Sequence, residues 1–158
     1  MPVDRKRFML KSAVHLFLLR DEAVLLLRRY NTGYEDGNYS VVAGHLDGGE
    51  PVKVAMQREA REEVGIEIAL DDLDVVGVMH RMSDEERIDF FLAARRWTGE
   101  VRNMEPQSCD ELRWVHPDAL PANTIPYVRQ ALENYRNGSK SQGDLPWFAS
   151  FGWDDPQS

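Results

Sequence analysis

The chain has 158 residues, with 42% apolar and 29% charged side chains, as expected of one globular domain spanning residues 1–158. The net charge is −8 and the pI about 5.0, which argues against a nucleic-acid polymer as partner, because no basic surface could neutralise a run of phosphates. A small phosphate ligand is not excluded, because bound cations can supply positive charge. The one cysteine, Cys109, cannot form an intrachain disulfide, so we expect a cytoplasmic location.

The chain begins with segments that predict β-strands. Residues 8–19 and 23–29 are rich in apolar and β-branched side chains and are separated by a short charged turn, which predicts a hairpin. The apolar run at residues 13–19 is too short to cross a bilayer, so we expect no membrane partner. After a polar loop with two glycines, residues 39–43 predict a further short strand.

A helix is predicted directly after this strand. Turn residues lead from Gly44 to Glu50, and Pro51 follows, which is favoured at a first helical position because its missing N–H would have no partner there. Gly65 suits the left-handed conformation that ends many helices. The predicted helix therefore spans residues 51–64.

Three glutamates share one face of the predicted helix. At about 100° per residue, Glu59, Glu62 and Glu63 fall within an arc of roughly 100°. The same arc is apolar one and two turns earlier, so it should face the protein. Acids at this spacing repel by a few tenths of a kcal/mol, and a hard cation such as Mg²⁺ or Mn²⁺ would offset that repulsion. The alternative is a solvated helix on which Arg58 and Arg61 neutralise the acids.

The whole stretch resembles the Nudix box, Gly-x5-Glu-x7-Arg-Glu-U-x-Glu-Glu-x-Gly-U, in which U is a bulky aliphatic residue. The one departure is Ala60, which is smaller than the usual aliphatic residue. The resemblance implies an α/β (α+β) fold, the Nudix α/β/α sandwich with a mixed central sheet. The matching positions are Gly44, Glu50, Arg58, Glu59, Glu62, Glu63, Gly65 and Ile66.

The resemblance also implies a hydrolase that cleaves a phosphoanhydride by water attack with the help of Mg²⁺, or of Mn²⁺ in its place. Its metal ligands would be Glu59, Glu62 and Glu63, together with the backbone carbonyl of Ala43 just before the box glycine. A carbonyl ligand does not depend on the side chain, so alanine is an acceptable residue there.

Other box residues would support these ligands. Arg58 would act in catalysis with Glu59 and Glu62, by orienting a box glutamate through a charge-assisted hydrogen bond. Gly44 and Glu50 would support the metal ligands without binding the metal themselves, Glu50 by tying the loop to the helix.

Downstream of the box, residues 75–80 and 88–96 predict two strands around a charged turn, and residues 112–115 predict another. Residues 117–121 predict a single turn. Pro126 opens a helix that should run to about Arg136, because its apolar positions follow helical spacing.

The general base is not fixed by the box alone, since in this family it is either a box glutamate or a carboxylate on a distant loop. The loop candidates are Glu105, Asp110 and Glu111, and we favour Glu111. The alternative is that these acids form an ordinary surface loop.

The tail, residues 137–158, is expected to be loop-like as far as residue 146 and aromatic beyond it. Trp147 and Trp153 are two of the four tryptophans in the chain. A free tail would not carry so much aromatic surface. We expect it to dock on its own domain or on a second subunit of a homodimer, or to form a wall of the substrate pocket.

The class of substrate is narrowed by the absence of sequence markers that characterise other subgroups of the family. The ADP-ribose-type marker is a proline downstream of the box, where this chain has Met82, and the NADH-type block Ser-Gln-Pro-Trp is absent. The tyrosine associated with dinucleoside polyphosphates is absent too. What remains resembles the MutT-like pyrophosphohydrolases of nucleoside triphosphates. The alternatives are another diphosphate (a nucleotide sugar, ADP-ribose or an isoprenoid), an isomerase, or a non-catalytic nucleotide sensor, which has no evident use for three clustered acids.

Several side chains are candidates for contact with a small nucleotide. His45 stands beside the box glycine, where it could touch phosphate. An amide such as Asn123 can both donate to and accept from a base edge. Core packing of the aromatic residues and helix capping by Asn123 or Thr124 are the alternative explanations. The candidates for the base are Phe8, His15, Phe17, Asn123, Thr124 and Tyr127.

Overall fold

The computed structural model describes residues 6–140 and 146–154. Along these described residues, eight strands, two α-helices and two 3₁₀ turns follow one another. In order, they are β1 (Lys11–Arg20), β2 (Ala23–Arg29), β3 (Tyr39–Ser40), β4 (Val42–His45), α1 (Val52–Val64), η1 (Leu70–Asp72), β5 (Asp74–Met82), β6 (Glu86–Ala94), β7 (Cys109–Val115), η2 (Pro117–Ala119), α2 (Pro126–Lys140) and β8 (Trp147–Phe151).

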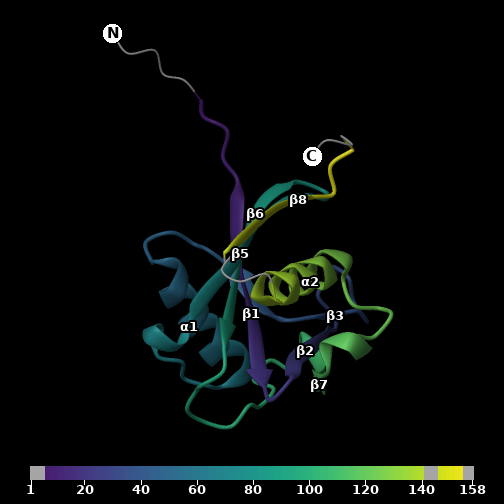
Figure 1. Cartoon of the computed structure of the whole chain (residues 1–158). Coiled ribbons are helices and arrows are strands. Elements are labelled where there is room, and N and C mark those ends of the chain that lie inside the picture. The colour runs from purple at the N-terminus through teal and green to yellow at the C-terminus, as the bar shows by residue number, and fades with distance from the viewer. Residues whose placement is uncertain (1–5, 141–145, 155–158) are drawn as a thin grey trace.

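Strand β1 connects the parts of the sheet. Along one edge it pairs antiparallel with β4 near its start and antiparallel with β2 at its end, and along the other edge it pairs parallel with β6 over most of its length. The strand order is β3-β2-β1-β6-β5-β8, with β4 also on β1 and β7 also on β2. The sheet is therefore mixed, as predicted from the sequence, and a helix packs on each side of it (Figure 1).

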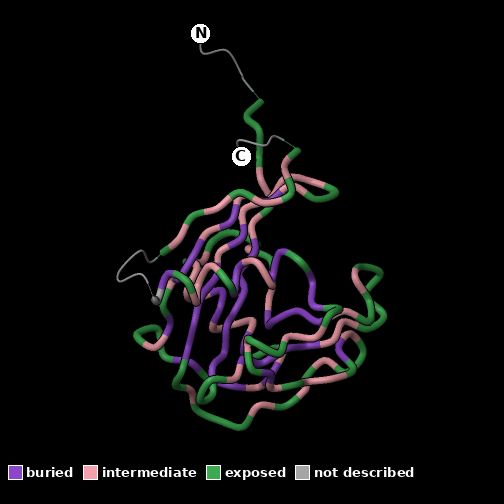
Figure 2. Tube along the Cα trace, turned by 45° about the vertical axis from the view of Figure 1, so that its right-hand side comes forward, coloured by how far each residue is buried: buried purple, intermediate pink, exposed green. Residues whose placement is uncertain are grey.

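The alternation of side chains along β1 produces two separate cores. Val14, Leu16 and Leu18 point to the side covered by α1, whereas Phe17 and Leu19 point to the side covered by α2. Buried positions accordingly follow the central strands in Figure 2. A strand buried on both faces reads as a continuous apolar run, which explains this part of the sequence.

Helix α1 has nearly the predicted bounds. Pro51 is its N-cap rather than its first helical residue, and Gly65 ends it with φ 71°, its N–H bonded to the carbonyl of Arg61 at 3.1 Å. Ala60, the departure from the family pattern, is fully buried with Met56 and the other apolar positions of this face. A small residue therefore lies where the helix approaches the sheet closely.

Several predicted boundaries are wrong, among them the start of β7, which is Cys109 rather than residue 112. Strand β1 begins at Lys11 rather than at residue 8, and Phe8 ahead of it is 73% exposed. Helix α2 continues to Lys140 rather than ending near Arg136. Helix propensity is a weak prior that tertiary packing overrides, and Gly138, a poor helix former, is buried here. The remainder of the predicted loop, residues 141–145, lies outside the described residues, as do residues 155–158.

The aromatic tail forms part of the sheet. Strand β8 pairs in parallel with β5, and the ring of Trp147 lies directly over Gly77, where any Cβ would overlap it. Beyond the strand, Trp153 Nε1 donates to the carbonyl of His80 at 3.1 Å. Within the described part of the chain, no helix has the length and apolar character needed to cross a membrane.

Candidate active site

The carboxylates near the end of α1 lie against strand β4. Glu63 Oε2 accepts the backbone N–H of Ala43 at 2.9 Å. The carboxylate of Glu59 lies directly over Gly44, where a Cβ would overlap it. Glu62, whose side chain is 50% exposed, lies beside them at the surface. Helical spacing and the pairing of β4 with β1 therefore bring two acids to adjacent residues of one strand.

Arg58 is the cation among these acids. Its Nη2 donates to Glu50 Oε1 at 2.7 Å and its Nη1 to Glu59 Oε1 at 2.8 Å. Nη1 also lies 3.4 Å from Glu62 Oε2. The hydrogen bonds from Arg58 lower the pKa of Glu50 below its usual range. Because Glu50 precedes the helix, this pair ties the loop to α1 while the same guanidinium holds Glu59 in place.

Two of the carboxylates, those of Glu59 and Glu63, lose water on burial, and their hydrogen bonds offset only part of that loss. Removal from water raises the pKa of Glu63 well above its usual range, and the N–H of Ala43 offsets only part of that effect. Burial likewise raises the pKa of Glu59 against the opposing hydrogen bond from Arg58, and the charge of Glu105 adds to both shifts. A cation would stabilise both ionised forms, and an all-oxygen donor set suits Mg²⁺ or Mn²⁺. The residues present therefore fit a hard divalent cation.

The fit of these residues to a divalent cation rests on their burial, their charge and their oxygen donors, and not on a complete coordination shell. In residues 6–140 and 146–154, no three histidine, cysteine, aspartate or glutamate side chains are already gathered as a metal site. Glu59 is engaged by Arg58, and Glu63 by the backbone of Ala43. The ligand set Glu59, Glu62, Glu63 and Ala43 stays a prediction.

The loop before β7 brings a further acid to the end of α1. The N–H of Met104 donates to the carbonyl of Glu63 at 3.0 Å, which satisfies one of the last carbonyls of the helix. The loop thereby follows the last turn of α1. Glu105 and Glu63 then line one cavity of about 190 Å³, with Ala43 in its wall.

The two other loop candidates are engaged elsewhere on β7. Glu111 Oε2 accepts the hydroxyl of Tyr39 at 2.7 Å, and Asp110 accepts two hydrogen bonds from Arg28 at 2.7 and 3.0 Å. Neither acid lines the cavity described above. Glu111, favoured as general base from the sequence, is bonded to Tyr39 outside this cavity, whereas the fold brings Glu105 to the box.

Gly44 is the box position at which a substitution has a clear steric outcome. Gly44→Ala is expected to displace the Glu59 carboxylate, because the new methyl group would overlap it. A displacement of about 1 Å can cost on the order of a hundredfold in kcat, and we expect a loss of that size. Steady-state kinetics checks it, with a thermal melt to show that the variant is folded. Unchanged turnover would mean that the position of Glu59 is unimportant.

A second cavity, of about 400 Å³, opens beside the first residues of the box. Ala43, Gly44 and His45 form the wall next to the carboxylates, and β1, the loop after β2, the β5–β6 hairpin and α2 form the other walls. Basic side chains outnumber acidic ones here, which suits a polyanionic nucleotide. The other lining residues are Ala13, His15, Arg29, Tyr34, Arg81, Asp84, Arg87 and Tyr127.

Three of the side chains suggested by the sequence line this cavity, namely His15, His45 and Tyr127. The sequence did not single out Arg29 or Arg81. Arg81 is buried on strand β5, and a charged residue at an inward strand position is a signal that could have revealed it.

The other candidates for base recognition have different surroundings. Phe8 is exposed ahead of β1, and Phe17 is fully buried in the core under α2. Asn123 Nδ2 donates to the carbonyl of Gly37 at 2.8 Å, which fixes a loop. Thr124 is buried and bonds to a backbone carbonyl of the preceding turn. Phe17, Asn123 and Thr124 therefore have structural partners, and none of the four side chains lines the cavity beside the box.

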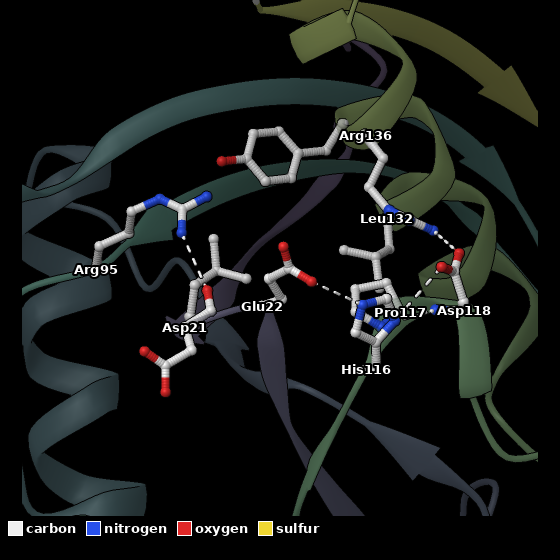
Figure 3. A pocket seen from close by; sticks show the side chains of 10 residues that line it. Asp21, Glu22, Arg95, His116, Pro117, Asp118, Leu132 and Arg136 are labelled. Carbon is white, nitrogen blue, oxygen red and sulfur yellow. Dashed lines mark hydrogen bonds and ion pairs between the residues drawn. The ribbon is translucent and has the colours of Figure 1, made fainter.

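Another cavity, of about 460 Å³, lies at the opposite end of β1, by the β1–β2 turn (Figure 3). Four of its polar side chains are paired with one another. His116 Nε2 lies 3.2 Å from Glu22 Oε2, and Arg136 Nη1 donates to Asp118 Oδ1 at 2.8 Å (Figure 3). We therefore place the candidate active site at the box and not here.

Curated relatives include the NAD-capped RNA hydrolase NudC of Pseudomonas aeruginosa strain LESB58, 31% identical over 112 residues. That match covers 71% of this chain and 38% of NudC, so the chain spans about two fifths of that relative. A putative 8-oxo-dGTP diphosphatase of Bacillus subtilis strain 168 is 25% identical over 130 residues, which cover 82% of each chain.

Solved structures include a MutT NUDIX hydrolase from Burkholderia pseudomallei. It is 28% identical, has a TM-score of 0.74 and is covered over 98% of its length by 80% of this chain. The family model of the NUDIX domain matches residues 9–135. The chain therefore belongs to the Nudix family.

Proposed function

We propose that the protein is a divalent-metal-dependent pyrophosphohydrolase that cleaves a phosphoanhydride bond of a nucleoside di- or triphosphate. The observation that supports this proposal most strongly is the cluster of Glu59 and Glu63 against Ala43 and Gly44, in which burial raises the pKa of both acids. Acids held in this state are stabilised by a bound cation. Family membership and the MutT-like solved structure support the same activity.

Glu59, Glu62, Glu63 and the carbonyl of Ala43 would hold the metal, for which we propose Mg²⁺, with Mn²⁺ as the alternative. When bound, the metal lowers the pKa of a water molecule and offsets charge on the phosphoryl oxygens. Arg58 keeps Glu59 in place through its hydrogen bond of 2.8 Å.

The chain also supplies a candidate for proton transfer. Glu105 lines the same cavity as Glu63 and Ala43, so its carboxylate can accept a proton from water held there. Glu111 does not line this cavity and is bonded to Tyr39 instead.

Replacing Glu105 or Glu111 by glutamine shows which of the two glutamates acts as the general base. Glu105→Gln is expected to lower kcat by about 10²- to 10⁴-fold, because an amide cannot accept the proton. Glu111→Gln should leave turnover near normal. Steady-state kinetics across pH measures both variants. The reverse result would assign the base to Glu111.

The substrate is proposed to be a nucleoside triphosphate, as expected from the missing markers and in line with the 8-oxo-dGTP diphosphatase name of one relative. A second candidate is a dinucleotide of the NAD type, which the similarity to proteins named NudC favours. The net charge of −8 argues against a nucleic-acid polymer.

A panel of substrates tests this proposal. Nucleoside triphosphates, NAD, ADP-ribose, nucleotide sugars and an isoprenoid diphosphate are incubated with Mg²⁺ and with EDTA, and the released phosphates are measured. We expect pyrophosphate and a nucleoside monophosphate from a triphosphate, only when metal is present. Binding without hydrolysis across the panel would instead indicate a nucleotide sensor.

Two further expectations from the sequence stay predictions, a homodimer and a cytoplasmic location. Phe148 on strand β8 is 73% exposed, which leaves apolar surface on the aromatic tail. Sedimentation of the full chain would show whether this surface is covered by a second copy.

A further inference from the structure

The loop between β6 and β7 carries Glu105, whose carboxylate has no hydrogen-bond or ion-pair partner among the described residues. This carboxylate is partly buried and lines the cavity that it shares with Glu63 and Ala43. Loops are more mobile than the elements they connect, and a displacement of about 1 Å can cost on the order of a hundredfold in rate. A general base in a loop therefore needs a backbone that is held in place.

The end of α1 holds the loop just before Glu105. The N–H of Arg102 donates to the carbonyl of Val64 at 3.0 Å, and the N–H of Met104 donates to the carbonyl of Glu63 at 3.0 Å. Both acceptors are among the last carbonyls of the helix, which have no partner within the helix itself. These hydrogen bonds align the loop with α1, but they end one residue short of Glu105.

The side chain of Asn103 extends this attachment to Glu105. Its Oδ1 accepts the N–H of Glu105 at 3.0 Å, and its Nδ2 donates to the carbonyl of Cys109 at 2.7 Å. Cys109 is buried and is the first residue of β7. An amide suits this position because it both donates and accepts at the end of one short side chain. Asn103 therefore links the N–H of Glu105 to the start of a strand of the sheet.

The backbone on the other side of Glu105 is held as well. The carbonyl of Glu105 accepts the N–H groups of Ser108 and Cys109, both at 3.0 Å. Pro106 follows directly, and a proline disfavours helical conformations of the residue before it. With its N–H bonded to Asn103 and its carbonyl bonded to these two residues, Glu105 keeps its freedom mainly in the side chain.

We propose that Asn103 is a positioning residue for hydrolysis, which holds the backbone of Glu105 so that the carboxylate faces the cavity shared with Glu63. The inference rests on the proposed function, because it takes Glu105 to be the general base. Asn103 itself lines neither cavity at the box, so it acts through Glu105 and not by contact with the substrate.

A double-mutant cycle between Asn103 and Glu105 tests this role. Wild type, Asn103→Ala, Glu105→Gln and the double variant are compared by steady-state kinetics with Mg²⁺ and the substrate that the panel identifies. We expect Asn103→Ala to lower kcat by about ten- to a hundredfold and to change KM by less than about twofold, because the base is displaced while the substrate keeps its contacts. In the Glu105→Gln background, the same substitution should lower kcat by less than about twofold.

The outcomes separate a positioning role from a merely structural one. An equal loss in both backgrounds would overturn the proposal, because Asn103 would then act on the fold and not through Glu105. Normal turnover of Asn103→Ala beside an impaired Glu105→Gln would overturn it too. Normal turnover of Glu105→Gln would instead remove the proposed general base, and with it the role of Asn103. The result for Glu105→Gln therefore distinguishes failure of the proposed base from failure of the inference alone.

Gln107→Ala is the matched control. It removes an amide from the same loop, and the side chain of Gln107 is exposed and has no hydrogen bond within the described part of the chain. This variant should keep the kcat and KM of the wild type. A loss as large as that of Asn103→Ala would overturn the proposal, because any change in the loop would then slow the reaction.

Amide hydrogen exchange on the wild type keeps the test independent of how Asn103→Ala folds. The N–H of Glu105 should be protected by about tenfold or more relative to its intrinsic exchange rate, because Asn103 Oδ1 accepts it. An unprotected Glu105 N–H would overturn the proposal. If Asn103→Ala does not fold, Asn103→Asp takes its place in the cycle, because it keeps this acceptor and loses only the donor to Cys109. Its smaller loss of kcat should likewise disappear in the Glu105→Gln background, and a loss that persists there would overturn the proposal.

Discussion

Replacing Glu62 by glutamine is expected to lower kcat about a thousandfold or more while changing the free energy of unfolding by less than about 0.5 kcal/mol. The side chain of Glu62 is 50% exposed, and its hydrogen bond to Arg58 Nη1, at 3.4 Å, is long. Exposed ion pairs of this kind contribute little to stability. The amide removes the charge that a divalent ion requires and keeps the shape, so activity should be lost from a folded protein.

Glu67→Gln is the matched control for this substitution. Glu67 is exposed just beyond the end of α1 and pairs with Arg61, but it lines none of the cavities at the box. Kinetics and thermal melts of both variants, with and without Mg²⁺, measure the contrast. Metal should raise the melting temperature of the wild type and of Glu67→Gln and have a smaller effect on Glu62→Gln. Full turnover by Glu62→Gln would mean that the box is not the active centre.

Local patterns in the sequence were sufficient to predict the element that carries the acids. A proline start, a glycine stop and helical spacing predicted residues 51–64, and the structure has α1 at Val52–Val64. The burial of a strand on both faces also follows from the apolar runs, because β1 and β2 supply side chains to both cores. Such features depend on neighbours in the sequence, where propensity and periodicity apply directly.

Contacts between distant segments could not be predicted in the same way. Glu105 and Glu111 have similar surroundings in the sequence, and only the hydrogen bond from Met104 to the end of α1 brings Glu105 to the box. Phe17 looked suitable for stacking on a base, but the alternation along β1 directs it into the core. The cavity beside the box draws on β1, β4, β5, β6 and α2, so its composition depends on the whole topology.

Asp89→Asn is expected to lower the free energy of unfolding at pH 7 by about 3–5 kcal/mol. Asp89 is fully buried and accepts hydrogen bonds from both Arg81 and His15. Asparagine removes the negative charge and leaves the Arg81 guanidinium without its counter-ion inside the protein. Its amide can accept only through one oxygen, so it also points an N–H₂ group at a second donor.

The effect of this substitution should depend on pH in a defined direction. The pKa of Asp89 is lowered to about 2 in the folded chain, against about 3.9 in an unfolded one. Its ionisation therefore stabilises the fold above about pH 4, and this contribution is lost as the pH falls towards 2. Chemical denaturation of both proteins between pH 2 and 7 should show their difference shrinking by about 2–3 kcal/mol at the acid end.

An acid on the neighbouring strand serves as the matched control for Asp89. Asp74 is exposed at the start of β5, the strand that pairs with the one carrying Asp89, so Asp74→Asn should change stability by less than about 0.5 kcal/mol. A difference between wild type and Asp89→Asn that stays constant from pH 7 to pH 2 would show that Asp89 is not ionised in the fold.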